Sequence, residues 1–583
     1  MVGEAGAGPS KPLGGFDTSV RRVSTPLPPP MGSRLAECLP FWESLGIPQL
    51  VLDWVRLGHA IPFVHGPPTF TRVKQTPLPA EPAKAQALLE EIQSLLDKGA
   101  IERVPPSQVR SGWYGHYFLV SKKTGGWRPI LNLKPLNVTI RVDSFKMETL
   151  KNVILATQPG EWLASVDLKD AYFHVPIRQL HRKYLRFCVN GKAYQYRVLP
   201  FGLSTSPRVF TKVLAPVIAH IRLQGIHVHP YLDDLLIRAD SPHLLRQAVQ
   251  VTLCSLKRAG FLVNFEKSHL FPTQDITYIG GRLCTHLGMV YLPQDRVTAI
   301  QCLANQFVEG RRLPARTWMK FLGLMASTIH VLPQARLRMR DIQMFLLTNW
   351  SPLSDSLFLR LRVPGHLCPA IQWWALQSNL TQGSQLSPPP HTRVLTTDAS
   401  GTGWGGVLDG VWTVKGDWVN EDLTLFINNQ EMRAVELSLH HFQDQLRGQS
   451  VLVRSDNTTT CAYINKQGGT KSWDLCLLAQ RLWLWCLQQD IHIRATYIPG
   501  KSNTPADALS RGKPLDSLAH PVVDQREWTL SREVAQAVFL ALGQPTTDLF
   551  ATRSNTQCPL FCSLEKGGGS GLKTPCPSGG RAL

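Results

Sequence analysis

Residues 230–238 read PYLDDLLIR, and this stretch decides how the rest of the sequence is interpreted. Asp233 and Asp234 lie between two apolar runs, a pattern that predicts a hairpin whose tight turn carries two acids. Carboxylates held this close repel one another and their pKa values rise, unless a cation occupies the gap. A solvated acidic turn is the alternative that this stretch alone leaves open.

A third acid extends the pattern. Residues 163–175 read LASVDLKDAYFHV, which places Asp167 at the end of an apolar strand. The cation that carboxylate oxygens favour is Mg²⁺, or Mn²⁺ in its place. Two such ions in one site can activate a 3′-hydroxyl and stabilise a leaving pyrophosphate in an in-line displacement. The three acids therefore predict a site for phosphoryl transfer.

The blocks around these acids resemble the palm and fingers of a reverse transcriptase. The resemblance covers about residues 80–290 and rests on ordered blocks at 122–137 (KKTGGWRPILNLKPLN), 167–177 (DLKDAYFHVPI), 199–210 (LPFGLSTSPRVF), 231–234 (YLDD), 260–270 (GFLVNFEKSHL) and 278–283 (YIGGRL). It implies that Asp167, Asp233 and Asp234 hold two metal ions. It also implies a dNTP-binding set, with Tyr172 as a gate against the ribose 2′-hydroxyl, Phe201 and Gly202 at the incoming base and sugar, and Lys122, Lys123, Arg128 and Lys267 at the phosphates.

Residues 391–512 predict a separate α/β domain with a second set of acids. Three short strands, expected at 393–397, 404–408 and 411–414, come first, and helices and strands alternate after them. The acids fall at strand ends and in helices, at Asp398, Glu431, Asp456 and Asp507. Each acid alone could be a surface charge or a helix cap.

The blocks around this second set resemble a ribonuclease H domain. They are residues 396–408 (TTDASGTGWGGVL), 428–439 (NNQEMRAVELSL), 454–470 (RSDNTTTCAYINKQGGT) and 497–511 (YIPGKSNTPADALSR). The resemblance implies that the four acids bind two Mg²⁺ ions across the scissile phosphate of the RNA strand in an RNA–DNA hybrid.

Charge and composition favour a nucleic-acid partner. The 583 residues carry a formal net charge of +20, and residues 101–240 hold 20 Lys and Arg against 9 Asp and Glu. A basic folded region of this kind suits a polyanion. We expect an RNA template, a DNA primer, the RNA–DNA hybrid and dNTPs as partners, with other proteins of the same element possible. No apolar run reaches the length of a membrane span and residues 1–22 do not resemble a signal peptide, so we expect an intracellular protein, cytoplasmic or nuclear.

The predicted fold class is α/β and multidomain, a right-hand polymerase of fingers, palm and thumb followed by a ribonuclease H-like domain. The expected segments are a largely disordered leader with a short apolar stretch (1–80), fingers and palm (81–290), a helical thumb or connection (291–383), a Pro-rich linker (384–390), the ribonuclease H-like domain (391–512) and a partly low-complexity tail (513–583).

Several phrases resemble the DIRS-like retrotransposons, which mobilise through a tyrosine recombinase. They are residues 41–63 (FWESLGIPQLVLDWVRLGHAIPF), 427–431 (INNQE), 463–475 (YINKQGGTKSWDL) and 548–563 (DLFATRSNTQCPLFCS). A gypsy-type element is the second candidate lineage. The expected activity is RNA-directed DNA synthesis with cleavage of the RNA strand of the hybrid. Two alternatives are a catalytically silent nucleic-acid-binding relic of a decayed element and, less favoured, a capsid-like protein.

Overall fold

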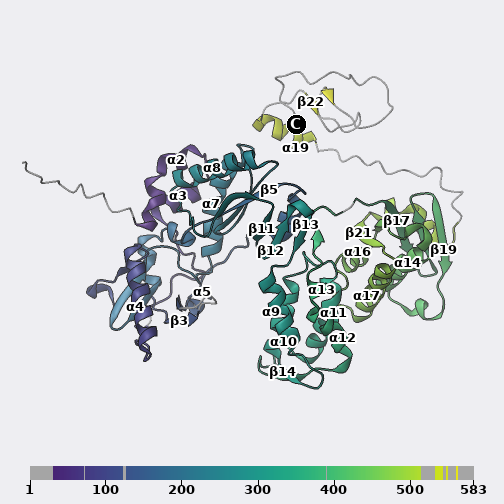
Figure 1. Cartoon of the computed structure of the whole chain (residues 1–583), viewed down its shortest axis with the longest axis horizontal. Helices are drawn as coiled ribbons and strands as arrows, with labels where there is room; N and C mark the ends of the chain where they lie inside the picture. Colours follow the sequence, from purple (N-terminus) through teal and green to yellow (C-terminus); the bar gives the residue numbers. More distant parts are fainter. Residues whose placement is uncertain are drawn as a thin grey trace, which may run out of the picture. The chain divides into compact units, whose positions relative to one another are not determined.

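The computed structural model describes residues 30–70, 72–121, 127–388, 390–513, 532–542, 547–548 and 560–561. The chain divides into two compact units (Figure 1). Unit 1 comprises Met1–Cys302, His330–Pro333 and Leu376–Ser387, and unit 2 comprises Leu303–Ile329, Gln334–Ala375 and Pro388–Leu583. Both units mix helices and strands, which confirms the predicted α/β, multidomain class. Every helix in the described part of the chain is too short or too polar to cross a membrane.

A four-stranded antiparallel sheet forms the centre of unit 1. Its order is β10 (His269–Thr273), β5 (Trp162–Asp167), β9 (Asp234–Ala239) and β8 (His227–Tyr231). The inner strands β5 and β9 are apolar because they are buried, with Leu163, Val166, Leu235 and Ile237 fully or almost fully inaccessible. Helices α7 (Ser206–Arg222) and α8 (Pro242–Arg258) pack against this sheet (Figure 1).

Smaller elements surround the central sheet. Helix α4 (Pro82–Asp97) ends before Gly99, whose φ of +64° is left-handed. Unit 1 also contains α6 (Leu150–Ala156) and nearly all of α9 (Gln294–Ala304). The remaining strands are β1 (Gln75–Thr76), β2 (Ile101–Arg103), β3 (Tyr117–Ser121), β4 (Trp127–Leu131), β6 (Arg186–Val189), β7 (Lys192–Tyr196), β11 (Asp275–Tyr278), β12 (Gly281–Cys284), β13 (Met289–Tyr291) and β16 (Ser384–Gln385).

The short apolar stretch predicted within the leader is folded and forms an integral part of unit 1. Helices α1 (Arg34–Glu37), α2 (Leu39–Ser44) and α3 (Gln49–Leu57) contribute to the same hydrophobic core as β5 and α7. Trp42 is completely buried, and its indole N–H donates to the carbonyl of Ala259 at 3.1 Å. These helices therefore belong to the core of unit 1.

The expected linker is also partly folded. Within residues 384–390, the short strand β16 pairs antiparallel with β13, and the amide of Leu386 donates to the carbonyl of Gly288 at 2.9 Å. Leu386 is buried. The Pro-rich composition predicted a break in regular structure. In the structure this break begins after β16.

Unit 2 begins with a helical part that the sequence placed in the thumb or connection. It consists of α10 (Ala315–Ala326), α11 (Ala335–Asn349) and α12 (Cys368–Ala375), with a two-stranded sheet of β14 (Arg312–Pro314) and β15 (Arg360–Arg362). Most of the segment 291–383 thus clusters with the C-terminal domain, whereas its two ends belong to unit 1.

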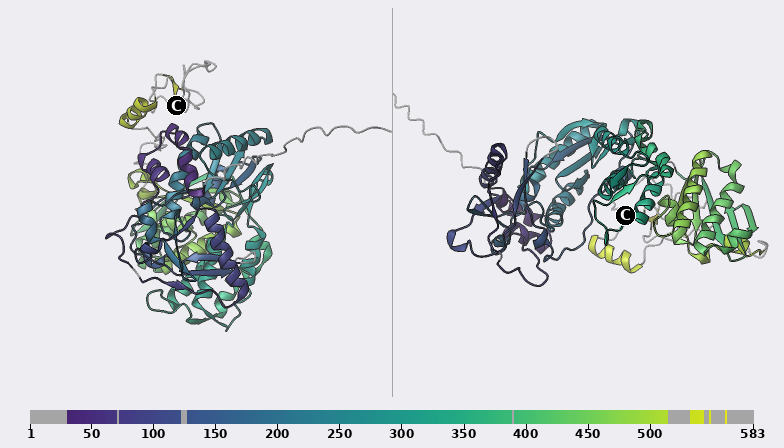
Figure 2. Two further views of the ribbon diagram at one scale, coloured as in Figure 1. Left: turned by 90° about the vertical axis from the view of Figure 1, so that its left-hand side faces the viewer. Right: turned by 90° about the horizontal axis from the view of Figure 1, so that it is seen from below.

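The C-terminal part of unit 2 is a five-stranded sheet with helices, seen from two further sides in Figure 2. The order is β19 (Trp412–Asp417), β18 (Gly403–Leu408), β17 (Arg393–Ala399), β20 (Ser450–Ser455) and β21 (His492–Tyr497). The strands β17, β20 and β21 run parallel, and β17, β18 and β19 run antiparallel. The main helices are α14 (Ile427–His441), α16 (Thr458–Asn465), α17 (Trp473–Gln488) and α18 (Thr504–Ser510), in the order that the sequence predicted.

Candidate active sites

The first candidate site lies where β5 ends and β9 begins. The register of the two strands places Asp167 directly opposite Asp234. Asp233 precedes β9 in the turn from β8, where Leu232 has a φ of +54°. Only a few non-glycine residues adopt such a conformation, and it turns the chain sharply enough to put two acids at the tip. The structure thus brings the three predicted acids to one edge of the central sheet.

Burial and mutual repulsion make these carboxylates hard to ionise. Burial, together with the charges of Asp233 and Asp167, raises the pKa of Asp234 to about 6. Burial also raises the pKa of Asp167. The exposed Lys267 lowers the pKa of both, so the predicted phosphate-binding lysine lies within electrostatic reach of the acids. An added cation would relieve the same repulsion more strongly.

Two polar residues that the sequence analysis did not single out hold Asp167 in place. The Ser268 hydroxyl accepts from the backbone amide of Asp167 at 3.0 Å and donates to the carbonyl of Asn264 at 2.7 Å. The amide of Asn264 in turn donates to the carbonyl of Asp167 at 2.8 Å. Both residues lie in the block at 260–270, where their short polar side chains among apolar residues were the available signal.

The predicted sugar gate lies in an aromatic cluster. The ring of Tyr172 is 5.0 Å from that of Phe201 and 5.7 Å from that of Phe210. Burial raises the pKa of Tyr172 to about 12, with the charge of Asp233 as the next cause. Asp233 therefore lies close enough to Tyr172 to act on it electrostatically. The structure thus places the rings of Tyr172 and Phe201, both predicted to contact the dNTP, beside each other.

Gly202 follows Phe201 with a φ of +92°, and its carbonyl accepts from the Asn137 side chain at 2.8 Å. The remaining predicted dNTP contacts are not all described. Lys122 and Lys123 lie outside the described residues. Arg128 belongs to β4, but its side chain is not among the described ones.

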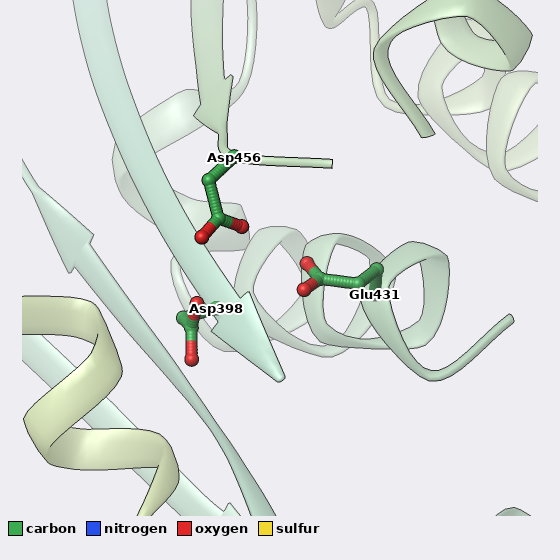
Figure 3. Close-up of side chains that lie close together, drawn as sticks. All are labelled: Asp398, Glu431 and Asp456. Atoms are coloured by element: carbon green, nitrogen blue, oxygen red, sulfur yellow. The ribbon is translucent and has the colours of Figure 1, made fainter. Parts of the chain in front are cut away.

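The second candidate site gathers three of the four predicted C-terminal acids. Asp398 lies near the end of β17, Glu431 in α14 and Asp456 directly after β20 (Figure 3). Each offers a carboxylate oxygen, and these oxygens all lie within 4.8 Å of one another. Within the described residues, these three acids are the group of potential metal ligands that meets this spacing. The group of Asp167, Asp233 and Asp234 does not meet it.

A hydrogen-bonded shell orients Asp398. Its Oδ1 accepts from the side-chain amide of Asn503 at 3.1 Å, and its Oδ2 accepts from the hydroxyl of Ser510 at 2.7 Å. Ser455 donates to Glu431 at 3.5 Å, the outer limit for such a bond. Sequence reasoning missed these residues, although Asn503 and Ser510 lie within the block at 497–511.

Three acids so close together strongly disfavour a third negative charge. Burial raises the pKa of Glu431 to about 8, and Asp398 and Asp456 add to the rise. Burial likewise raises the pKa of Asp398 to about 6, opposed by the bond from Ser510. The pKa of Asp456 is raised by burial too. The site consists of carboxylates alone, and this donor set fits a hard divalent cation such as Mg²⁺ or Mn²⁺.

Asp507 is near this group but not within it. It lies in the first turn of α18, and its Oδ1 accepts from Arg511 at 2.9 Å. Its negative charge raises the pKa of Asp398 and of Asp456, so it contributes to the local field. The predicted quartet is therefore a tight trio with a fourth, half-exposed acid that is paired to an arginine.

Part of unit 1 is similar to a known protein family. Residues 120–283 match the family model described as reverse transcriptase (RNA-dependent DNA polymerase). The Tf2-3 and Tf2-7 transposon polyproteins of Schizosaccharomyces pombe are each 23% identical over 456 residues, which cover 75% of this chain and 31% of each relative. The chain thus spans about a third of the length of these curated relatives.

Solved structures with detectable similarity include a foamy viral protease-reverse transcriptase. Its complex with dsDNA is 18% identical with a TM-score of 0.46, covering 81% of this chain and 98% of that one. Its complex with an RNA/DNA hybrid is 16% identical with a TM-score of 0.47, covering 87% and 67% respectively.

Proposed function

We propose that this chain is an RNA-directed DNA polymerase whose active site is the Asp167, Asp233 and Asp234 edge of β5 and β9. The observation that carries the proposal is the register of Asp167 opposite Asp234, within the segment that matches the reverse transcriptase family. The substrates would be dNTPs, an RNA template and a DNA primer. The basic character of residues 101–240 supports a nucleic-acid partner.

Some residues of this site would act through their charge and others through their shape. Asp167, Asp233 and Asp234 would hold two divalent cations, which supply Lewis-acid activation of the primer 3′-hydroxyl and stabilise the leaving pyrophosphate. Lys267, whose charge already acts on Asp167 and Asp234, would neutralise phosphate oxygens. Tyr172, held by Phe201 and Phe210, would exclude a ribose 2′-hydroxyl by steric clash.

A second activity is favoured by a separate observation. The trio Asp398, Glu431 and Asp456 offers oxygens within 4.8 Å of one another in a domain with its own sheet. We propose that this site cleaves the RNA strand of an RNA–DNA hybrid with two Mg²⁺ or Mn²⁺ ions, with Asp507 as the fourth acid. Ser510 and Asn503 would fix the orientation of Asp398, so that its oxygens face the metal site.

Two assays on one preparation test both activities. Purified full-length protein with Mg²⁺ should extend a DNA primer on an RNA template and cut the RNA of a preformed hybrid. Asp234→Asn should abolish extension and leave cleavage, and Asp456→Asn should do the reverse. Extension lost in both variants would argue against independent sites. A wild-type protein that binds nucleic acid but neither extends nor cuts would support the silent-relic alternative.

The origin of the chain is a further part of the proposal. The Schizosaccharomyces pombe relatives are transposon polyproteins, which supports a retrotransposon source and other proteins of the element as partners. The DIRS-like lineage rests on the phrases at 41–63, 427–431, 463–475 and 548–563, the last of which lies largely outside the described residues. A tyrosine recombinase reading frame beside the gene would support this lineage, and an integrase frame would favour the gypsy type.

A further inference from the structure

The two-stranded sheet of unit 2 has one apolar face and one face of arginines. Strands β14 and β15 pair antiparallel, with Leu313 opposite Leu361 and Arg312 opposite Arg362. The two leucines are buried, whereas the arginines of these strands are exposed. Because successive side chains of a strand point to opposite faces, Arg360 lies on the same face as Arg362. We call Arg312, Arg360 and Arg362 the arginine ribbon.

The ribbon concentrates positive charge without compensation. Like charges directly opposite each other on paired strands are destabilising. Within the described part of the chain, none of these three arginines forms an ion pair with a carboxylate. Residues 303–375 as a whole hold nine Lys and Arg against three Asp and Glu. Repulsion between Arg312 and Arg362 therefore persists in the free protein and would be relieved by an anionic ligand.

Two more cations extend the ribbon onto the adjoining helix. Helix α10 begins directly after β14, and its Arg316 and Lys320 are both exposed. They are four residues apart and so lie on one face of the helix. The amide of Arg316 donates to the carbonyl of Leu357 at 2.9 Å, which ties the start of α10 to the segment before β15. Together these elements form an extended row of cations rather than a single point charge.

We propose that the arginine ribbon binds the phosphodiester backbone of a nucleic-acid duplex, without regard to its sequence. Guanidinium groups bind phosphates bidentately. Residues two apart on a strand are roughly 7 Å apart, so the row suits a polymer of phosphates better than a single anion. This inference rests on the proposed function, because the hybrid and the DNA product are the duplexes that the two activities would handle.

One buried arginine joins the helical part of unit 2, which carries the ribbon, to the nuclease domain of the same unit. We therefore expect the ribbon to serve the nuclease. Arg340 of α11 donates to the carbonyls of Lys466 at 2.6 Å, Gln467 at 3.2 Å and Gly468 at 3.0 Å. The amide of Leu337 donates to the Gln467 side chain at 3.1 Å. A duplex bound at the ribbon is thereby held by the same compact unit that carries Asp398, Glu431 and Asp456.

The test measures duplex affinity of the full-length protein against salt concentration, in EDTA so that no cleavage occurs. The probes are a labelled DNA duplex and an RNA–DNA hybrid, each in two unrelated sequences. The variant carries Arg312→Gln, Arg360→Gln and Arg362→Gln. The matched control carries Arg56→Gln, Arg282→Gln and Arg393→Gln, which remove the same charge from exposed or half-exposed arginines that are paired with Glu43, Asp275 and Asp409.

We expect the ribbon variant to lower the slope of log affinity against log salt by about 2 to 3, since each lost phosphate contact accounts for about 0.9. The control should keep the wild-type slope. Replacement of the ribbon by three lysines should keep most of the slope, because the charge remains, and this variant also guards against misfolding.

A ribbon variant with the wild-type slope, or with a loss no larger than that of the control, would overturn the proposal. So would a loss confined to one duplex sequence. Because binding is measured without metal, a wild-type protein that binds duplex through the ribbon yet fails to extend or cut would count against the proposed function and not against the ribbon.

Discussion

The hydroxyl of Ser510 donates a hydrogen bond to Oδ2 of Asp398 at 2.7 Å, and both residues are almost completely buried. Ser510 lies at the end of α18 and Asp398 near the end of β17, so this bond joins the last helix of the domain to its central strand. The charged carboxylate is the better acceptor because charge-assisted bonds are about twice as strong as neutral ones.

Ser510→Ala should lower the rate of hybrid cleavage by about ten- to a hundredfold, since a bond to a charged group contributes roughly 1.5–3 kcal/mol. The bond holds down the pKa of Asp398, so the acid limb of the cleavage pH profile should also move to higher pH. Primer extension should not change. Ser438→Ala is the matched control. Ser438 lies in the same domain, and within the described residues its buried hydroxyl has no hydrogen-bond partner. Equal losses in both variants would remove Ser510 from this role.

The stability of unit 2 should depend on pH through Glu431 and Asp398. Their folded pKa values, about 8 and about 6, lie above their ordinary values, so the folded state binds more protons than the unfolded state in this window. Stability in EDTA should therefore fall as pH rises from about 4 to 8. Thermal melting should show this fall, and Mg²⁺ should reverse it. Glu431→Gln should flatten the dependence, and an unchanged pH profile in that variant would contradict the assignment.

Tyr172→Val should let the polymerase accept ribonucleotides. Removing the ring that packs on Phe201 and Phe210 opens the space that a 2′-hydroxyl needs. The ratio of kcat/KM for rNTP over dNTP should rise by about tenfold or more, a change of roughly 1.4 kcal/mol or more. Tyr172→Phe keeps the ring and should keep the discrimination. If the phenylalanine variant also accepts rNTPs, the hydroxyl and not the ring is the gate.

Arg340→Met should destabilise unit 2 by about 2–4 kcal/mol, because it removes a buried guanidinium that donates to three backbone carbonyls, two of them in buried residues. The carbonyls concerned belong to Lys466, Gln467 and Gly468. Denaturant unfolding would measure the loss. Arg336→Met, on the same helix and less buried, should change stability by no more than about 0.5 kcal/mol. Similar losses of unfolding free energy in the two variants would show that the hydrogen bonds of Arg340 do not stabilise unit 2.

The sequence by itself determined the elements whose signals are local. The alternation around YLDD predicted a hairpin, and β8 and β9 form one. In residues 391–512 the sequence predicted three strands followed by alternating helices and strands, and β17 to β21 with their helices follow that order. Periodicity and turn residues act over a few positions, so they can be read without knowing what each element packs against.

Only the tertiary structure decided which distant residues meet. Trp42 donates to Ala259, and no local pattern near residue 42 identifies that partner. The pairing of β16 with β13 and the bonds from Asn503 and Ser510 to Asp398 are equally non-local. A buried polar group must find a partner, but which one it finds depends on how the whole chain packs. For that reason the sequence predicted the acids of both sites, and the structure supplied the residues that hold them.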